Sequence, residues 1–191
     1  MTVRRFSRAA MLVVVVAGVS LFGLASAGAA AVSVNVPCLS GDPTALVAAI
    51  NAANGGGGGT VNLASGCHYL LTAADNGENG LPVVTSRISV NGNGATIDGT
   101  GVVRVLEVDG PGGSLTLNSV TITGGSADIG GGIANLNGAV TLNHSQVTGN
   151  TAAHGGGIFN FGGTVSLSAS SVTGNNPDNC EPPGTIAGCT G

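Results

Sequence analysis

Three charged residues near the middle of the chain, Glu107, Asp109 and Arg104, are the candidates for catalysis. Glu107 and Asp109 flank Val108, so a β-strand there places both carboxylates on one face, roughly 7 Å apart. Two carboxylates and an arginine could bind calcium and promote β-elimination from a uronate, or act as an acid–base pair in glycoside cleavage. The alternative is a solvated acidic edge that carries no chemistry.

The elements that would position these residues follow a repeat of 25 residues. Residues 130–154 and 155–179 align without a gap and are identical at 13 of 25 positions. A more divergent unit precedes them, and in this register Val108 falls in the column of Ile133. A still earlier unit, 88–99, matches if its turn is two residues longer. Self-similarity at such a period is typical of solenoid proteins.

Apolar residues alternate within each unit, over short runs rich in Val, Ile and Thr that Gly and Asn separate. Strands this short cannot bury a face alone, but stacking equivalent strands about 4.8 Å apart joins their inward side chains into one core. The pattern predicts an all-β fold, a right-handed parallel β-helix of about five coils, since right-handed winding is the default for parallel crossovers.

Turn and cap residues fit this fold. Gly149 and Gly174 should end strands with positive φ, and Asn135 over Asn160 should form a ladder of side-chain amides. Asp42 as N-cap and Pro43 as the first helical residue predict a capping α-helix. Its buried face would comprise Leu46, Ala49, Ile50 and Ala53.

The first residues form a different kind of sequence. Three arginines within the first ten positions precede an apolar run at 11–24 and a small-residue stretch at 25–31 with A-x-A-like sites. This pattern predicts that 1–31 is a secretory signal peptide. The alternative is an uncleaved membrane anchor, for which the run is short of the ~20 residues that a spanning helix needs. The export route, general secretory or twin-arginine, stays open.

The remaining chain, 32–191, reads as one β-helix domain. It divides into an N-terminal cap at 38–59, coils at 60–179 and a tail at 180–191 that a disulfide would close. This part holds nine acidic residues, two arginines and no lysine, a formal charge of −7. Such a surface would repel a polyanion, which excludes nucleic acid as the expected partner. No membrane contact is expected after the leader is removed.

Four cysteines in an exported chain suggest two disulfides. Of three connectivities, we expect Cys38 with Cys67 and Cys180 with Cys189, and the other two stay open. A metal site is the weaker alternative, because the chain has no C-x-x-C motif and none of its three histidines has zinc-like spacing to a cysteine. We therefore expect no metal site and no cofactor, unless calcium serves the lyase alternative.

Several motifs resemble a known family. The Gly-Gly-Gly-Ile-x-Asn and Ser-x-Val-Thr-Gly-Asn repeats, the Asp-Pro-Thr-Ala-Leu segment and residues 88–99 resemble secreted bacterial right-handed parallel β-helix repeat proteins. These are similar to pectin-lyase-like proteins and to polymorphic outer-membrane protein repeats. The resemblance covers nearly all of 38–191 and implies the fold, but no single reaction. The paired-Asp and Gly-His-Gly motifs of polygalacturonases are missing.

Outward columns of hydroxyl side chains favour a second class of function. The candidate binding residues are Thr116 and Thr141 in one column and Thr123, Thr148 and Thr173 in another. Flat hydroxyl arrays suit an extracellular glycan or a cell wall, although Thr is also an ordinary polar residue of solvated sheets.

The alignment weighs against the catalytic alternative. It places Gly132 and Gly157 in the column of Glu107, so charge does not continue along the stack. In the column of Asp109 it places Ala134 and Phe159. We therefore expect an extracellular structural or glycan-binding protein, with a polysaccharide lyase or glycoside hydrolase as the alternative.

Overall fold

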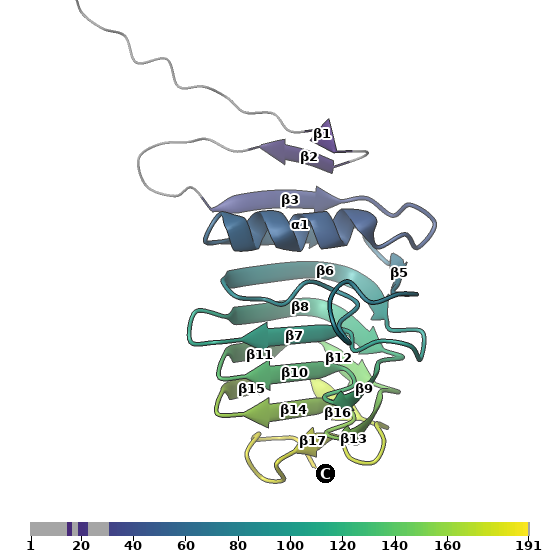
Figure 1. Ribbon diagram of the computed structural model, residues 1–191, viewed down its shortest axis with the longest axis vertical. Helices are drawn as coiled ribbons and strands as arrows, with labels where there is room; N and C mark the ends of the chain where they lie inside the picture. Colours follow the sequence, from purple (N-terminus) through teal and green to yellow (C-terminus); the bar gives the residue numbers. More distant parts are fainter. Residues whose placement is uncertain (1–14, 17–18, 23–30, 191) are drawn as a thin grey trace, which may run out of the picture.

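The chain winds into a parallel β-solenoid of about six turns with one short helix (Figure 1). A computed structural model describes residues 15–16, 19–22 and 31–190. The largest sheet stacks one strand from each turn, β3 (Val32–Val36), β4 (Gly58–Leu63), β6 (Arg87–Asp98), β8 (Ser114–Thr123), β11 (Ala139–Asn143) and β15 (Thr164–Ser168). These strands pair in parallel throughout, which confirms the predicted architecture.

The other faces of the solenoid are shorter. Strands β6 and β8 bend and continue into a second face with β5 (His68–Leu70), β12 (Gln146–Thr148) and β16 (Ser171–Thr173). A separate sheet contains β7 (Leu106–Asp109), β10 (Ile133–Leu136), β14 (Ile158–Phe161) and β17 (Cys180–Glu181). Strands β9 (Ser126–Ile129) and β13 (Thr151–His154) form a third, two-stranded sheet.

The solenoid has about six turns, one more than expected. The additional turn begins with β3, which precedes the helix and pairs in parallel with β4. The outer edge of β3 pairs antiparallel with β2 (Val19–Phe22), which follows β1 (Val15–Val16). Apart from these two strands and Ala31, the predicted signal peptide lies outside the described residues. No helix in the described part of the chain is long and apolar enough to cross a membrane.

Helix α1 (Thr44–Gly55) lies between β3 and β4 in the chain and covers the core at the N-terminal end (Figure 1). Oδ1 of Asp42 accepts hydrogen bonds from the hydroxyl and the backbone N–H of Thr44, at 2.6 and 2.8 Å. Both bonds lower the pKa of the Asp42 carboxyl, and the bond from the Thr44 hydroxyl has the larger effect. The predicted apolar face is buried, together with Ala45.

Inward side chains of successive turns form one continuous core. Ile158 is fully buried, as the 25-residue columns predict. Val165 also packs against the core but stays half-buried, because β15 belongs to the last turn and has no further strand beyond it in the sheet. Thr173 is exposed on the outer surface, as predicted.

Corners between the faces use residues with positive φ. Gly149 (φ +67°) and Gly174 (φ +66°) confirm the predicted turns. At the corner between the two halves of the largest sheet, non-glycine residues adopt this conformation, namely Asn93, Ser119, His144 and Ala169. Asparagine tolerates the left-handed region better than most residues, but serine and alanine there carry a backbone cost that the surrounding ladder must offset.

Two ladders of buried asparagine amides run inside the solenoid. Nδ2 of Asn135 donates to Oδ1 of Asn160 at 2.8 Å, which confirms the predicted pair. Nδ2 of Asn150 donates to Oδ1 of Asn175 at 2.9 Å, and Asn150 also accepts the N–H of Gly125. These amides supply partners to backbone groups that the corners leave unpaired.

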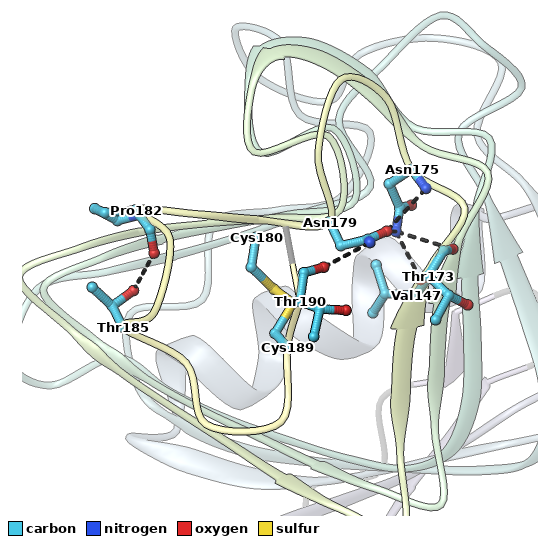
Figure 2. Close-up of a disulfide and its surroundings, with 9 residues drawn as sticks. All are labelled: Val147, Thr173, Asn175, Asn179, Cys180, Pro182, Thr185, Cys189 and Thr190. Carbon is cyan, nitrogen blue, oxygen red and sulfur yellow. Dashed lines mark hydrogen bonds between the residues drawn. A yellow bond between two sulfur atoms is a disulfide. The ribbon is translucent and has the colours of Figure 1, made fainter.

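Both expected disulfides form, Cys38 with Cys67 and Cys180 with Cys189. The second holds the C-terminal tail across the end of the solenoid, where Nδ2 of Asn179 donates to the carbonyl of Thr190 (Figure 2). The tail also buries Ile186 against the core. Two disulfides and no free cysteine among the described residues indicate a non-reducing compartment.

Candidate functional site

Arg104 is almost completely buried, with 5% of its surface exposed, and carboxylates contact it from two segments. Its Nη1 lies 2.7 Å from Oε2 of Glu107, and its Nη2 lies 3.1 Å from Oε2 of Glu78. Glu107 reaches the guanidinium from β7, and Arg104 lies three residues earlier, just before that strand begins. The structure thus brings together two of the three residues that the sequence predicts as catalytic.

The guanidinium of Arg104 also binds two groups outside β7. Its Nη1 donates to Oδ1 of Asn79 at 2.7 Å, and its Nε donates to the carbonyl of Ile129 at 3.0 Å. Backbone bonds between Arg104 and the segment around Asn79 run in both directions, with Glu78 accepting and Gly80 donating. Arg104 therefore fastens the segment that precedes β6 to the side of the solenoid.

Asp109 does not join this cluster. It lies exposed at the end of β7, and none of the hydrogen bonds or ion pairs among the described residues involves its side chain. The two carboxylates point outward from the same strand, as alternation predicts, yet only Glu107 has a cationic partner. Glu107 and Asp109 therefore do not form a catalytic pair that faces one substrate.

The predicted column around these acids is wrong by two residues. Leu106, not Val108, pairs with Ile133, because the loop between β7 and β8 is two residues longer than the loop between β10 and β11. Ala134 and Phe159 therefore continue the column of Glu107, and Leu136 and Phe161 continue that of Asp109. A shift of two preserves which side chains point outward, so the next two residues after each acid along the stack are still uncharged. Charge returns to the column of Glu107 at Glu181, the register partner of Phe159.

The catalytic alternative would use calcium as its metal. Within the part of the chain that the structure describes, no three His, Cys, Asp or Glu side chains gather closely enough to hold a metal ion. Two histidines instead each contact a single carboxylate at the surface. Nε2 of His68 lies 3.0 Å from Asp98, and Nδ1 of His154 lies 3.2 Å from Glu181. Exposed pairs of this kind contribute little to stability.

The five candidate threonines lie on two faces of the largest sheet. Thr116 pairs in register with Thr141 on the first face, and Thr148 pairs with Thr173 on the second. Thr123 follows Ile122, the register partner of Val147, so it extends the second column by one turn. The corner at Ser119 separates the two groups. Each group forms its own hydroxyl array.

The first array is longer than the pair Thr116 and Thr141 that the sequence predicts. Register pairing extends it in both directions over all six strands, as Ser33, Thr60, Ser89, Thr116, Thr141 and Ser166. In the part of the chain described, the hydroxyls of Thr60, Thr116 and Thr141 appear in no hydrogen bond. A ligand on this face would therefore find their donors and acceptors available.

A ladder of asparagine amides lies two residues along the same strands. Each Nδ2 donates to the Oδ1 of the preceding turn at 2.8–3.2 Å, through Asn35, Asn62, Asn91, Asn118 and Asn143. Sequence reasoning missed it, although an asparagine follows an inward apolar residue in five of the six strands and gives a visible signal. The ladder holds the hydroxyl array in a straight line, because each bond fixes the register of neighbouring strands.

No protein-family model, curated protein or solved structure matches the sequence.

Proposed function

We propose that this protein is secreted and acts outside the cell in a structural or glycan-binding role. The predicted leader at 1–31 supports export, and the two disulfides support an oxidising destination. The expected result of export is a chain in the culture medium whose intact mass corresponds to a start between Gly28 and Val32. Recovery of only full-length protein in the membrane fraction would contradict the proposal.

The hydroxyl array on the largest sheet carries the glycan-binding proposal. Its six members repeat about every 4.8 Å along the axis, beside the asparagine ladder. On the first face, before the corner, Arg87 is the one charged side chain at the outward positions of these six strands, and Asp98 of β6 lies beyond the corner on the second face. Sugars present rows of hydroxyl groups, and a flat surface of hydroxyls and amides offers both donors and acceptors to them.

The alternative is a polysaccharide lyase or glycoside hydrolase. Its predicted residues would be Glu107, Asp109 and Arg104. The contacts of Arg104 are used to hold a neighbouring segment, and this favours a structural role for it and for Glu107. No specific observation favours the enzymatic alternative over the binding role.

A polysaccharide-binding assay with and without calcium separates the two functions. We expect the purified protein to be retained by at least one polysaccharide and to release no sugar product. A Thr116→Val/Thr141→Val variant should weaken retention, because valine keeps the shape of threonine but removes its hydrogen bonds. Thr148→Val/Thr173→Val on the second face is the matched control.

Two outcomes would count against the proposal. If both double variants are retained equally, the first array is not the surface that binds the polysaccharide. Calcium-dependent release of unsaturated uronides by the wild type, abolished in Glu107→Gln/Asp109→Asn, would favour the lyase.

A further inference from the structure

A groove of about 790 Å³ follows one corner of the solenoid, where β6, β8 and β11 begin. Its walls come from the segments that lead into these strands, at 85–87, 111–114 and 137–139, and from Gly57 in the preceding turn. The register of the sheet aligns Arg87 with Ser114 and Ala139, so the groove crosses four successive turns. At about 4.8 Å per turn it extends roughly 14 Å along the axis.

Small residues line this groove. Gly112, Gly113 and Gly138 are among them, and the last two are buried and closely packed, since a side chain at either would collide with neighbouring backbone. The register partner of Arg87 on β4 is Gly58, so no side chain stands beside the arginine on that strand. The guanidinium of Arg87 is therefore accessible to a ligand.

Four polar side chains of the groove have no protein partners within the described part of the chain, whereas the hydroxyl of Ser86 donates to Ala53 and Asn54. The guanidinium of Arg87 is exposed and has no carboxylate within 4.0 Å there. The side chains of Thr85, Ser114 and Asn137 likewise appear in no hydrogen bond among the described residues. These groups offer a charged fork, two hydroxyls and an amide in one groove.

Charge distinguishes this groove from the rest of the surface. None of the nine acidic residues lines it, and Asp109, which precedes its Pro111 loop, lies outside it. Within 31–190 the other arginine, Arg104, is buried and paired with Glu78 and Glu107. Among the described residues, the groove is therefore the place where a single anionic group meets an unpaired guanidinium, while the acidic remainder of the surface repels the rest of a polyanion.

A second hollow, of about 280 Å³, lies on the other side of Arg87. It is lined by Thr60, Ser89 and Thr116 of the hydroxyl array. Arg87 thus stands where the groove meets the array. One extended ligand could place an anionic group at Arg87 and its hydroxyl groups along Thr60 and Thr116.

We propose that this groove binds an anionic sugar residue of an extracellular polysaccharide through its carboxylate or sulfate. The inference rests on the proposed glycan-binding function and narrows it. The planar guanidinium binds either group through two parallel hydrogen bonds, which are stronger than bonds between neutral groups. Ser114, Thr85 and Asn137 bind the hydroxyls of the same or the next sugar.

Affinity measurements with three polymers test the proposal in calcium-free buffer at fixed ionic strength. Alginate presents carboxylates, dextran sulfate presents sulfates and dextran is neutral. We expect the wild type to bind one of the two anionic polymers more tightly than dextran, and the preferred one identifies the group. Arg87→Gln should weaken that binding about ten- to hundredfold, the value of a hydrogen bond to a charged group.

A pair of matched variants separates the groove from the net charge. Ser114→Asp places a carboxylate beside Arg87 and should weaken anionic binding more than tenfold. Ser171→Asp makes the same change on the second face, in β16 three turns away and more than a Debye length from Arg87, and should weaken it less than about threefold. Arg87 and both serines are solvent-accessible, so circular dichroism and melting should show intact folding in all three variants.

Each result that would contradict the proposal leads to a different conclusion. Equal binding of dextran and the anionic polymers, unchanged in Arg87→Gln, overturns the inference and leaves the glycan-binding function standing. Anionic binding that survives Arg87→Gln assigns the ligand to another surface and also overturns it. Binding of none of the three polymers overturns the inference, and the retention assay on other polysaccharides decides the glycan-binding function separately.

Discussion

Arg104 places a full positive charge inside the solenoid wall, where water is largely excluded. Glu107, Glu78 and Asn79 compensate for this by direct hydrogen bonds to its guanidinium. A buried charge pair often contributes little compared with apolar residues, but removal of one partner leaves the other charge without compensation. Arg104 is thus a residue whose loss the fold tolerates poorly, whether or not the pair adds net stability.

Arg104→Met should lower the free energy of unfolding by about 3 kcal/mol, because Glu107 keeps its charge and loses its partner. Urea denaturation followed by circular dichroism measures the change. Asp109→Asn is the control on the same strand, and it should stay within about 0.5 kcal/mol because the carboxylate is exposed. Similar values for the two variants would show that Arg104 does not hold the segment around Glu78.

Tyr69 offers a second residue-scale test. It is the one tyrosine of a chain that has no tryptophan and no lysine, so few other side chains titrate near pH 10. Its hydroxyl donates to the carbonyl of Val36 and accepts the N–H of Ala64, both at 3.2 Å. Burial raises its pKa.

The stability of the protein should fall as the pH rises above about 10, the pKa of tyrosine in an unfolded chain. Above that value the unfolded state releases the phenolic proton while the folded state retains it, so deprotonation favours unfolding. Tyrosinate absorbance should therefore rise together with the loss of circular dichroism. Tyr69→Phe should remove this dependence. Titration at the ordinary value in the intact fold would contradict the assignment.

At the scale of elements, the asparagine ladder couples β3, β4, β6, β8 and β11. An inner member both donates to and accepts from its neighbours, whereas Asn143 at the end only donates. Asn118 also donates to Oγ of Ser89 at 3.3 Å. Asn118→Ala should therefore cost about 3 kcal/mol and Asn143→Ala about 1 kcal/mol, one for each bond lost. Thermal or urea unfolding of the two variants gives the comparison. A larger loss at Asn143 would exclude the ladder as the source of the effect.

The strands of the last two repeats could be predicted from sequence because their loops are equal in length. Register pairs Ile133 with Ile158 and Val140 with Val165, as the 25-residue spacing requires. The earlier units resist such alignment. The longer loop after β7 shifted Glu107 by two positions, and the ladder spacings of 27, 29, 27 and 25 residues show how the turns vary.

The candidate site was less predictable than the strands. Glu78 and Asn79 lie outside the repeat, and nothing in the local sequence indicates that they bind Arg104 across 26 and 25 residues. The groove at Arg87 depends on which loops are stacked next to one another, and this follows from register. Side chains inside the repeat could be predicted from the sequence. Contacts made by loops that depart from the repeat could not.

The whole molecule is quasi-one-dimensional, since each turn contacts mainly its two neighbours. The two disulfides lie at opposite ends of this stack and close chain segments with separations of 29 and 9 residues. Loop-closure entropy assigns about 3–4 kcal/mol to the longer and about 2–3 kcal/mol to the shorter. In a solenoid such contributions should act mainly on the turns next to each disulfide.

Removal of Cys180–Cys189 by a double serine substitution should therefore loosen one end of the molecule. The tail, with its buried Ile186, would no longer be fixed over the end of the core, so amide hydrogen exchange should accelerate in β14, β15 and β16. Exchange in β4 and β6 should stay unchanged, and Cys38→Ser/Cys67→Ser should produce the reverse pattern. Uniform acceleration over all turns in both variants would mean that the solenoid opens as a single cooperative unit, because local opening leaves distant turns protected.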